Sequence, residues 1–112
     1  MDERHSKSAV VRQFRMRSER AQELVRSIAI DTSRVIIGDH ARRRMAEREI
    51  SDIEVYRILQ TGHVMEEPSQ TDMKEWKCKI VKTLKGNREA GVVTVILHSG
   101  MLFAMTVEWE DL

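Results

Sequence analysis

The chain has 112 residues, a formal net charge of +1 and a single cysteine, Cys78. This length suits one domain with a core that needs no disulfide or metal, and one cysteine excludes an internal disulfide. No stretch contains the roughly 18 consecutive apolar residues that a membrane-spanning helix needs, and the polar N-terminus lacks the apolar segment of a signal peptide. We therefore expect a cytoplasmic protein without membrane association.

Charge is unevenly distributed along the chain. Residues 1–48 carry 12 basic against 7 acidic side chains, whereas residues 49–112 carry 7 against 11. Eleven of the twelve basic residues in the first segment are arginines. The planar guanidinium suits phosphate and carboxylate groups, which favours an anion-binding N-terminal half. Arginine is also a good helix former, so the same residues equally fit solvated helices.

The N-terminal half shows helical periodicity. Apolar residues recur at three- and four-residue spacing over residues 9–30, which predicts an amphipathic helix after a disordered tail over residues 1–8. A short β-branched run at residues 34–37 is typical of a strand. Asp39 is then the expected N-cap of a helix over residues 40–49, because its carboxylate can accept from the free amides of the first turn.

A second helix is predicted immediately afterwards. Residues 51–54 read S-x-x-E, the capping box in which a serine hydroxyl and a glutamate carboxylate each bind the other's backbone N–H. Thr61 and Gly62 end this helix, and we expect Gly62 in the left-handed conformation of a helix C-cap.

Beyond Gly62 the pattern becomes that of a sheet. Residues 63–67 and 76–85 alternate between apolar and polar side chains, which predicts two strands. Two further strands, at residues 92–97 and 101–107, are almost wholly apolar. Because both faces of these two strands are apolar, we expect them in the sheet centre or with one face covered by a partner.

A two-residue turn at Ser99 and Gly100 is expected to join the last two strands as a hairpin. If His98 pairs with Met101, then Ile96 faces Phe103, Thr94 faces Met105 and Val93 faces Thr106. Helices followed by an antiparallel meander predict one α+β domain over residues 9–112, with the helices packed on one face of the sheet.

The stretch at residues 38–51 concentrates one histidine and four arginines. Successive fourth residues drift by about 40° around a helix, so His40, Arg44 and Arg48 form one stripe. The positive end of the helix dipole disfavours imidazolium at His40, which favours a neutral base, and the same end attracts phosphate. A base, an anion-attracting helix end and an arginine suit phosphodiester cleavage, whereas a histidine beside arginines also fits an ordinary helix surface.

The remaining arginines of this helix have structural interpretations. Arg43 lies four residues from both Asp39 and Glu47, so we expect ion pairs with them. Arg42 is expected to be solvated. Arg48 borders the apolar face, where an ion pair with Asp52 or Glu54 is the alternative to a functional role.

The motif D-H-A-x-x-R-M-x-E-R-x-I-S at residues 39–51, together with HVMEE at 63–67 and AMTVEWED at 104–111, resembles the bacterial domain-of-unknown-function family 4258. The resemblance covers residues 35–111 and leaves the helix over residues 9–30 as an extension. That family is distantly similar to the RelE and BrnT toxins, which are small α+β ribonucleases that act without a metal. The resemblance therefore implies a RelE-like fold and an endoribonuclease activity.

The resemblance also implies roles for individual residues. It places His40, Arg44, Arg48 and Thr106 in the catalytic site, where His40 takes the proton of a ribose 2′-hydroxyl, Arg44 stabilises the phosphorane and Thr106 orients a phosphate oxygen. The expected products are a 2′,3′-cyclic phosphate and a 5′-hydroxyl. The candidates for the general acid are Lys77, Lys79, Lys82 and His98. The expected RNA contacts are Arg42, Lys77, Lys79 and Lys82.

The implied partners are RNA and an acidic antitoxin that covers the arginines, with no cofactor. The alternative is a non-catalytic interaction module, homodimeric through the strand at residues 101–107 or through the N-terminal helix. A sequence pI of about 8.0 and few aromatic residues for base stacking count against RNA binding. A zinc site is disfavoured because its only soft ligands have no recognised spacing: His40, His63, Cys78 and His98.

Overall fold

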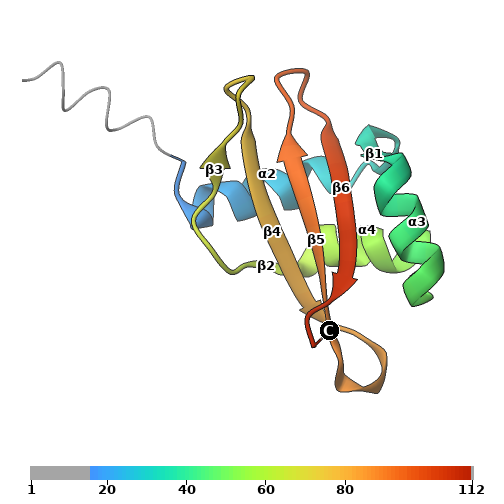
Figure 1. Ribbon diagram of the computed structural model, residues 1–112. Coiled ribbons are helices and arrows are strands. Elements are labelled where there is room, and N and C mark those ends of the chain that lie inside the picture. The colour runs from blue at the N-terminus through green and yellow to red at the C-terminus, as the bar shows by residue number, and fades with distance from the viewer. Residues whose placement is uncertain (1–15, 112) are drawn as a thin grey trace, which may run out of the picture.

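The computed structural model describes residues 16–111, which form three α-helices and a six-stranded sheet (Figure 1). In chain order the elements are α2 (Ser18–Ala29), η1 (Thr32–Arg34), β1 (Val35–Ile37), α3 (Asp39–Arg48), α4 (Asp52–Thr61), β2 (His63–Val64), β3 (Ser69–Gln70), β4 (Trp76–Thr83), η2 (Lys85–Asn87), β5 (Glu89–Ile96) and β6 (Leu102–Trp109). The α+β class is confirmed. The predicted tail and the first residues of the predicted N-terminal helix lie outside the described residues.

The sheet is mixed rather than wholly antiparallel. Its strand order is β1-β6-β5-β4-β2, with β3 also paired to β4. The strands β4, β5 and β6 form the predicted antiparallel meander, whereas β1 runs parallel to β6 along one edge. The strand predicted over residues 63–67 is shorter in the structure, because only His63 and Val64 pair with β4.

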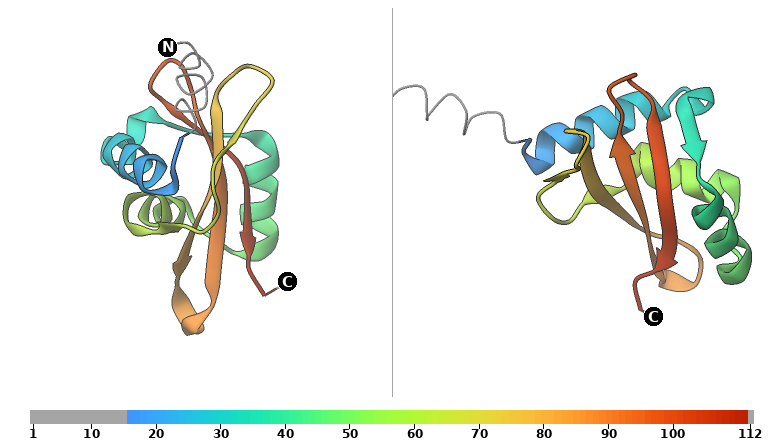
Figure 2. Two further views of the ribbon diagram at one scale, coloured as in Figure 1. Left: turned by 90° about the vertical axis from the view of Figure 1, so that its left-hand side faces the viewer. Right: turned by 45° about the horizontal axis from the view of Figure 1, so that its top comes forward.

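One sheet face carries the core. Figure 2 shows α2 and α4 together on one side of the sheet, with α3 set apart from them beyond β6. Along each strand, side chains that point to the helices alternate with side chains that point to the opposite face, as in any pleated strand. The side chains on the helix-covered face form the core. They include Cys78, Ile80, Val92, Leu102, Ala104 and Val107.

The helices α2 and α4 are joined by side-chain bonds to backbone carbonyls. Arg26 donates to the carbonyl oxygens of Thr61 at 3.2 Å and Gly62 at 2.8 Å. Gln60 Nε2 in turn donates to the carbonyl of Ala29 at 2.9 Å. These bonds satisfy carbonyl groups that a helix end leaves without partners, so each helix caps the other.

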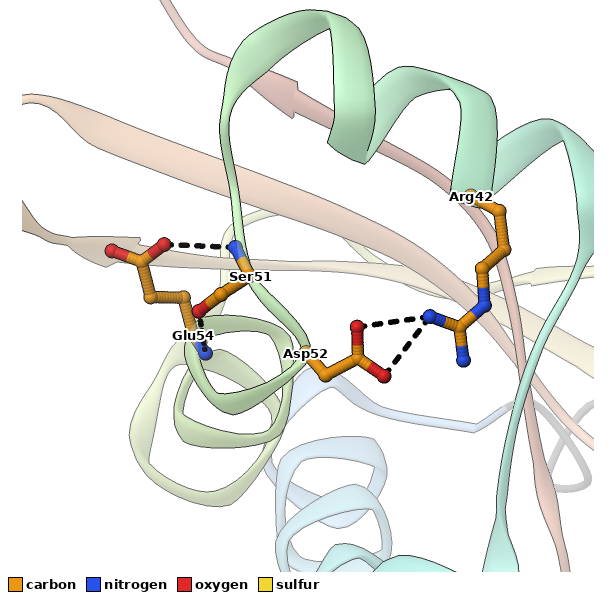
Figure 3. A network of polar contacts seen from close by, with 4 residues as sticks. All are labelled: Arg42, Ser51, Asp52 and Glu54. Atoms are coloured by element: carbon orange, nitrogen blue, oxygen red, sulfur yellow. Dashed lines mark hydrogen bonds and ion pairs between the residues drawn. The ribbon is translucent and has the colours of Figure 1, made fainter.

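The predicted start of α4 is confirmed. Ser51 Oγ accepts from the backbone N–H of Glu54 at 3.1 Å, and the Glu54 carboxylate accepts from the Ser51 N–H at 2.9 Å (Figure 3). The predicted left-handed end is wrong, because Gly62 has φ −79° and ψ −176°. Gly62 is required for space, since a Cβ there would lie 2.5 Å from the Ile58 carbonyl oxygen and 2.7 Å from Ile80 Cγ2.

The boundaries of α3 also differ from the prediction. Gly38 rather than Asp39 is the N-cap, and its carbonyl accepts from the Arg42 N–H at 2.9 Å. At its other end α3 has a left-handed C-cap that was not predicted, Glu49, with φ 57° and ψ 45°. The Glu49 carbonyl accepts from Lys85 Nζ at 3.1 Å. A contact with a distant loop thus supports a conformation that the local sequence does not indicate.

The predicted hairpin turn is one residue too short. Leu97 and Met101 close the loop through an N–H to carbonyl bond of 2.9 Å, so the loop has three residues, 98–100. Gly100 adopts φ 86°, the left-handed position that three-residue hairpin loops favour.

A β-bulge in β6 corrects the register. Near the turn Thr94 pairs with Ala104 rather than with Met105, and Ile96 pairs with Leu102 rather than with Phe103. Met105 has no partner in β5, and beyond it Val93 pairs with Thr106 as predicted. The extra residue compensates for the longer loop and restores the expected pairing.

The crowding around Gly62 gives a stability prediction. We expect Gly62→Ala to lower the free energy of unfolding by about 3 kcal/mol, at the upper end of the range for overpacked cores, because backbone atoms surround the added methyl group. The matched control is Gly86→Ala, where φ is +66° but no atom lies within 4 Å, so only about 1 kcal/mol is expected. Urea unfolding followed by circular dichroism measures both, and equal losses would contradict the steric explanation.

Cys78 gives a prediction about reactivity and pH. Burial raises the pKa of its thiol from 9.0 to about 11. The thiolate fraction at pH 8 is then roughly 100-fold lower than for an ordinary thiol, so native protein should react at least that much more slowly with a thiol reagent than protein unfolded in urea. The unfolded chain releases this proton first, so stability should fall between pH 9 and 11. The Cys78→Ala variant should not show this loss of stability between pH 9 and 11. Identical profiles of unfolding free energy against pH for the variant and the wild type would contradict the prediction.

Candidate functional site

Two hydrogen bonds hold α3 beside β6. At its start, the Gly38 N–H donates to the Ala104 carbonyl at 3.0 Å, and a Cβ on Gly38 would lie 2.7 Å from Phe103 Cζ. At its end, Trp109 Nε1 donates to the Arg48 carbonyl at 3.0 Å. The helix therefore lies along β6, and both of its ends are bonded to residues of that strand.

The rotation of α3 about its axis is set by Ala41 and Met45, which are both buried. At about 100° per residue, His40 and Arg42 project from flanks about 200° apart. Arg42 reaches α4, where its Nη1 lies 2.9 Å from both carboxylate oxygens of Asp52 (Figure 3). His40 and Arg44 therefore project from the flank turned away from α4.

The start of α3 borders the sheet face that α2 and α4 leave uncovered, because a Cβ on Gly38 would lie 2.7 Å from Phe103 Cζ of this face. The strand register identifies which side chains share the face. Two rows of cross-strand neighbours are Lys79–Val93–Thr106 and Lys77–Val95–Phe103. Three of the predicted site residues on strands, Lys77, Lys79 and Thr106, thus lie together.

Two predicted RNA contacts lie elsewhere. Lys82 pairs with Ala90, which pairs with the buried Trp109, so this row belongs to the helix-covered face. Arg42, expected to be solvated, is instead paired with Asp52. The structure therefore separates Lys82 and Arg42 from Lys77 and Lys79.

Glu47 connects two arginines of the stripe. Its Oε1 lies 2.8 Å from Arg44 Nη1 and 3.2 Å from Arg48 Nη1. The hydrogen bond from Arg44 is the main cause that lowers the pKa of the Glu47 carboxyl. These pairs are exposed or half-exposed, so a phosphate can replace the carboxylate at small free-energy cost.

The ion pairs predicted for Arg43 and Arg48 are wrong. Arg43 forms none with any residue of 16–111, because Glu47 turns to Arg44 and Arg48 instead. For Arg48, Asp52 is occupied by Arg42 and Glu54 by the capping box. A helix places several arginines within reach of one carboxylate, and the packing against β6 decides between them.

The lysines of the uncovered face differ in their partners. Lys79 Nζ lies 2.8 Å from Glu110 Oε2 and 3.2 Å from Glu108 Oε2. The hydrogen bond with Glu110 is the main cause that raises the Lys79 pKa. The Lys77 side chain forms no hydrogen bond or ion pair within the described part of the chain. Lys79 is therefore held as a charged group, and Lys77 is the freer of the two.

The two histidines named as site candidates differ in their surroundings. The His40 side chain is exposed and has no hydrogen bond to the described residues. His98 lies in the β5–β6 loop, where its Nε2 is 2.9 Å from the Met73 carbonyl oxygen. His40 is thus accessible to a substrate, whereas His98 links two loops.

A groove of about 490 Å³ on the uncovered face was not predicted as a site. Its lining includes Val95, Phe103 and Met105 from the two apolar strands, Lys77 from β4, and residues of the loop before β4. The apolar character of both strand faces was the available signal for it. The bulge at Met105, which directs this side chain into the groove, could not be read from the sequence.

Residues 16–111 contain neither a cluster of metal ligands nor a membrane-spanning helix. No three His, Cys, Asp or Glu side chains lie together as metal ligands would. None of the described helices combines the length and apolar character needed to cross a membrane.

Most of the residues of the candidate site lie in a part of the chain that matches a family model. A family model described as a domain of unknown function (DUF4258) matches residues 37–107. No curated protein and no solved structure matches the chain. The matched segment contains α3, α4 and all but the end of β6, and therefore His40, Arg44, Arg48 and Thr106, whereas α2 precedes it. Because more than half of its residues are matched, the chain belongs to the family described as a domain of unknown function (DUF4258).

Proposed function

We propose that the protein is a metal-independent endoribonuclease of the RelE-like toxin class, with its site between α3 and the uncovered sheet face. The observation that carries this proposal is that α3 lies along β6 with His40 and Arg44 on the flank turned away from α4, while Thr106 of β6 shares a cross-strand row with Lys79. A base, an arginine and further cations around one surface are what cleavage of a phosphodiester requires.

In this mechanism the His40 imidazole accepts the proton of a ribose 2′-hydroxyl. The 2′-oxygen attacks the adjacent phosphorus, and the bond from phosphorus to the 5′-oxygen breaks. Arg44 and the Thr106 hydroxyl donate to the non-bridging oxygens of the phosphorane. The leaving 5′-oxygen takes a proton from a general acid, for which Lys77 and Lys79 are the candidates on this face. The products are a 2′,3′-cyclic phosphate and a 5′-hydroxyl.

Arg44 must exchange partners for this reaction. Its guanidinium is bound to Glu47 in the free protein, and a phosphate must take the carboxylate's place. The same exchange suits an acidic antitoxin, whose carboxylates would occupy the arginines when the protein is not acting on RNA. Exposed ion pairs contribute at most about 1 kcal/mol, so both exchanges are accessible.

The test is cleavage of a mixed RNA pool by the purified full chain in excess chelator. We expect His40→Ala to lower the rate by about 10²–10⁴-fold and Arg44→Ala by about 10²–10³-fold, since each removes a group that acts only in the transition state. Arg43→Ala is the matched control, because Arg43 is exposed and forms no ion pair with residues 16–111. End-group analysis should find 2′,3′-cyclic phosphates.

Intact RNA with the wild-type chain, or an unchanged rate with His40→Ala, would reject the catalytic role. Loss of activity in excess chelator would reject the metal-independent mechanism.

A second candidate function, a homodimeric interaction module, has its own supporting observation. Three large apolar side chains around the groove are exposed: Ile36 by 39%, Met73 by 72% and Met105 by 37%. Ile36 pairs with Phe103, so it lies on the uncovered face beside the groove. Contiguous exposed apolar surface of this kind is typical of protein contacts.

For this function we expect Met105→Asp to convert a dimer into a monomer, because a carboxylate would be buried without a partner at the contact. Sedimentation equilibrium measures the association. Met65→Asp is the matched control, since Met65 is 64% exposed and lies in the loop after β2, outside the groove. A wild-type chain that stays monomeric at millimolar concentration would exclude the homodimer.

A further inference from the structure

A hollow of about 370 Å³ lies at the C-terminal end of α3, separate from the groove. Its lining is Glu47, Arg48, Glu49, Lys85, Arg88 and Trp109. The three cations come from separate parts of the chain: the last residue of α3, η2 and the residue before β5. We call this site the Trp109 hollow.

Arg48 has an unused donor in this region. Its side chain is 24% exposed, and its Nη1 is bound to Glu47. Its Nε is buried and has no acceptor among the described residues. A buried N–H without an acceptor is unfavourable, and an anion in the hollow would supply one.

Arg88 and Trp109 form one wall. The Arg88 guanidinium lies 4.3 Å from the centre of the Trp109 ring and is held there by Asp111, with bonds of 3.1 Å from Nε and 2.9 Å from Nη2. The Trp109 indole N–H donates to the Arg48 carbonyl. Trp109 therefore couples the two arginines, and its ring is a spectroscopic reporter inside the hollow.

The Lys85 side chain can turn toward the Trp109 hollow. It is 59% exposed, its Nζ donates to the Glu49 carbonyl at 3.1 Å, and the Glu54 carboxylate is 4.0 Å away. The lining has three cations against two carboxylates, and one of the two, Glu47, is shared with Arg44. Asp111 and Glu54, which pair with Arg88 and Lys85, lie outside the lining, so an anion entering the hollow meets the three cations beside Glu47 and Glu49.

We propose that the Trp109 hollow binds a phosphate group. The guanidinium groups of Arg48 and Arg88 donate to its oxygens, with Lys85 as a mobile third cation. The ring of Trp109 is covered by Arg88 and is 5% exposed, so it offers no face on which a base can stack. The ligand is thus recognised by its phosphate, either free or carried by a nucleotide, and this site does not depend on the proposed cleavage.

The test uses the full chain with Trp76→Phe, which leaves Trp109 as its only tryptophan. Sodium phosphate or a 5′-nucleoside monophosphate is added at constant ionic strength, against sodium chloride alone. We expect a saturable change in Trp109 fluorescence and a shift of its indole N–H resonance. Arg48→Gln and Lys85→Gln should each weaken binding, Arg48→Gln by about tenfold. Arg57→Gln, an exposed arginine of α4 outside the hollow, is the matched control and should bind normally.

A tighter response to the nucleotide than to inorganic phosphate supports a nucleotide ligand, and an equal response supports free phosphate. The proposal fails if neither ligand changes the Trp109 signals, or if Arg48→Gln, folded by circular dichroism, responds as wild type does. His40→Ala must bind phosphate normally, so failure of the proposed cleavage and failure of this site are separable.

Discussion

The position of α3 against β6 is the constraint on which the candidate site depends. The Gly38 N–H bond to Ala104 fixes the start of the helix, and the Trp109 indole bond to Arg48 fixes its end. With both ends held, burial of Ala41 and Met45 leaves one rotation, in which Arg42 reaches α4 and His40 and Arg44 project from the opposite flank.

Features set by residues three or four apart could be read from the sequence. The capping box needs only Ser51 and Glu54, and the stripe of His40 and Arg44 needs only helical periodicity. Alternation along β4 likewise places Cys78 and Ile80 on the buried face. In each case residues close to one another in the sequence supply both the pattern and its physical reason.

Features that depend on contacts between distant segments could not be read in this way. The left-handed Glu49 is supported by Lys85, and the space required by Gly62 is set by β4. The Val93–Thr106 pair was correctly predicted although its turn was not, because the three-residue loop and the bulge offset each other. Thr106 therefore shares a cross-strand row with Lys79 and Val93 for a reason that the local sequence pattern does not contain.

The cations of the site are already partly neutralised in the free protein. Lys79 is paired with Glu108 and Glu110, and Arg44 is paired with Glu47. On the proposed function, RNA would have to displace these carboxylates, so the net electrostatic gain would be smaller, and the salt dependence of affinity weaker, than the number of basic residues indicates. The apolar groove beside them supplies contact energy that salt does not screen. A macromolecule that spans both surfaces would therefore be held mainly by the groove and oriented by the charges.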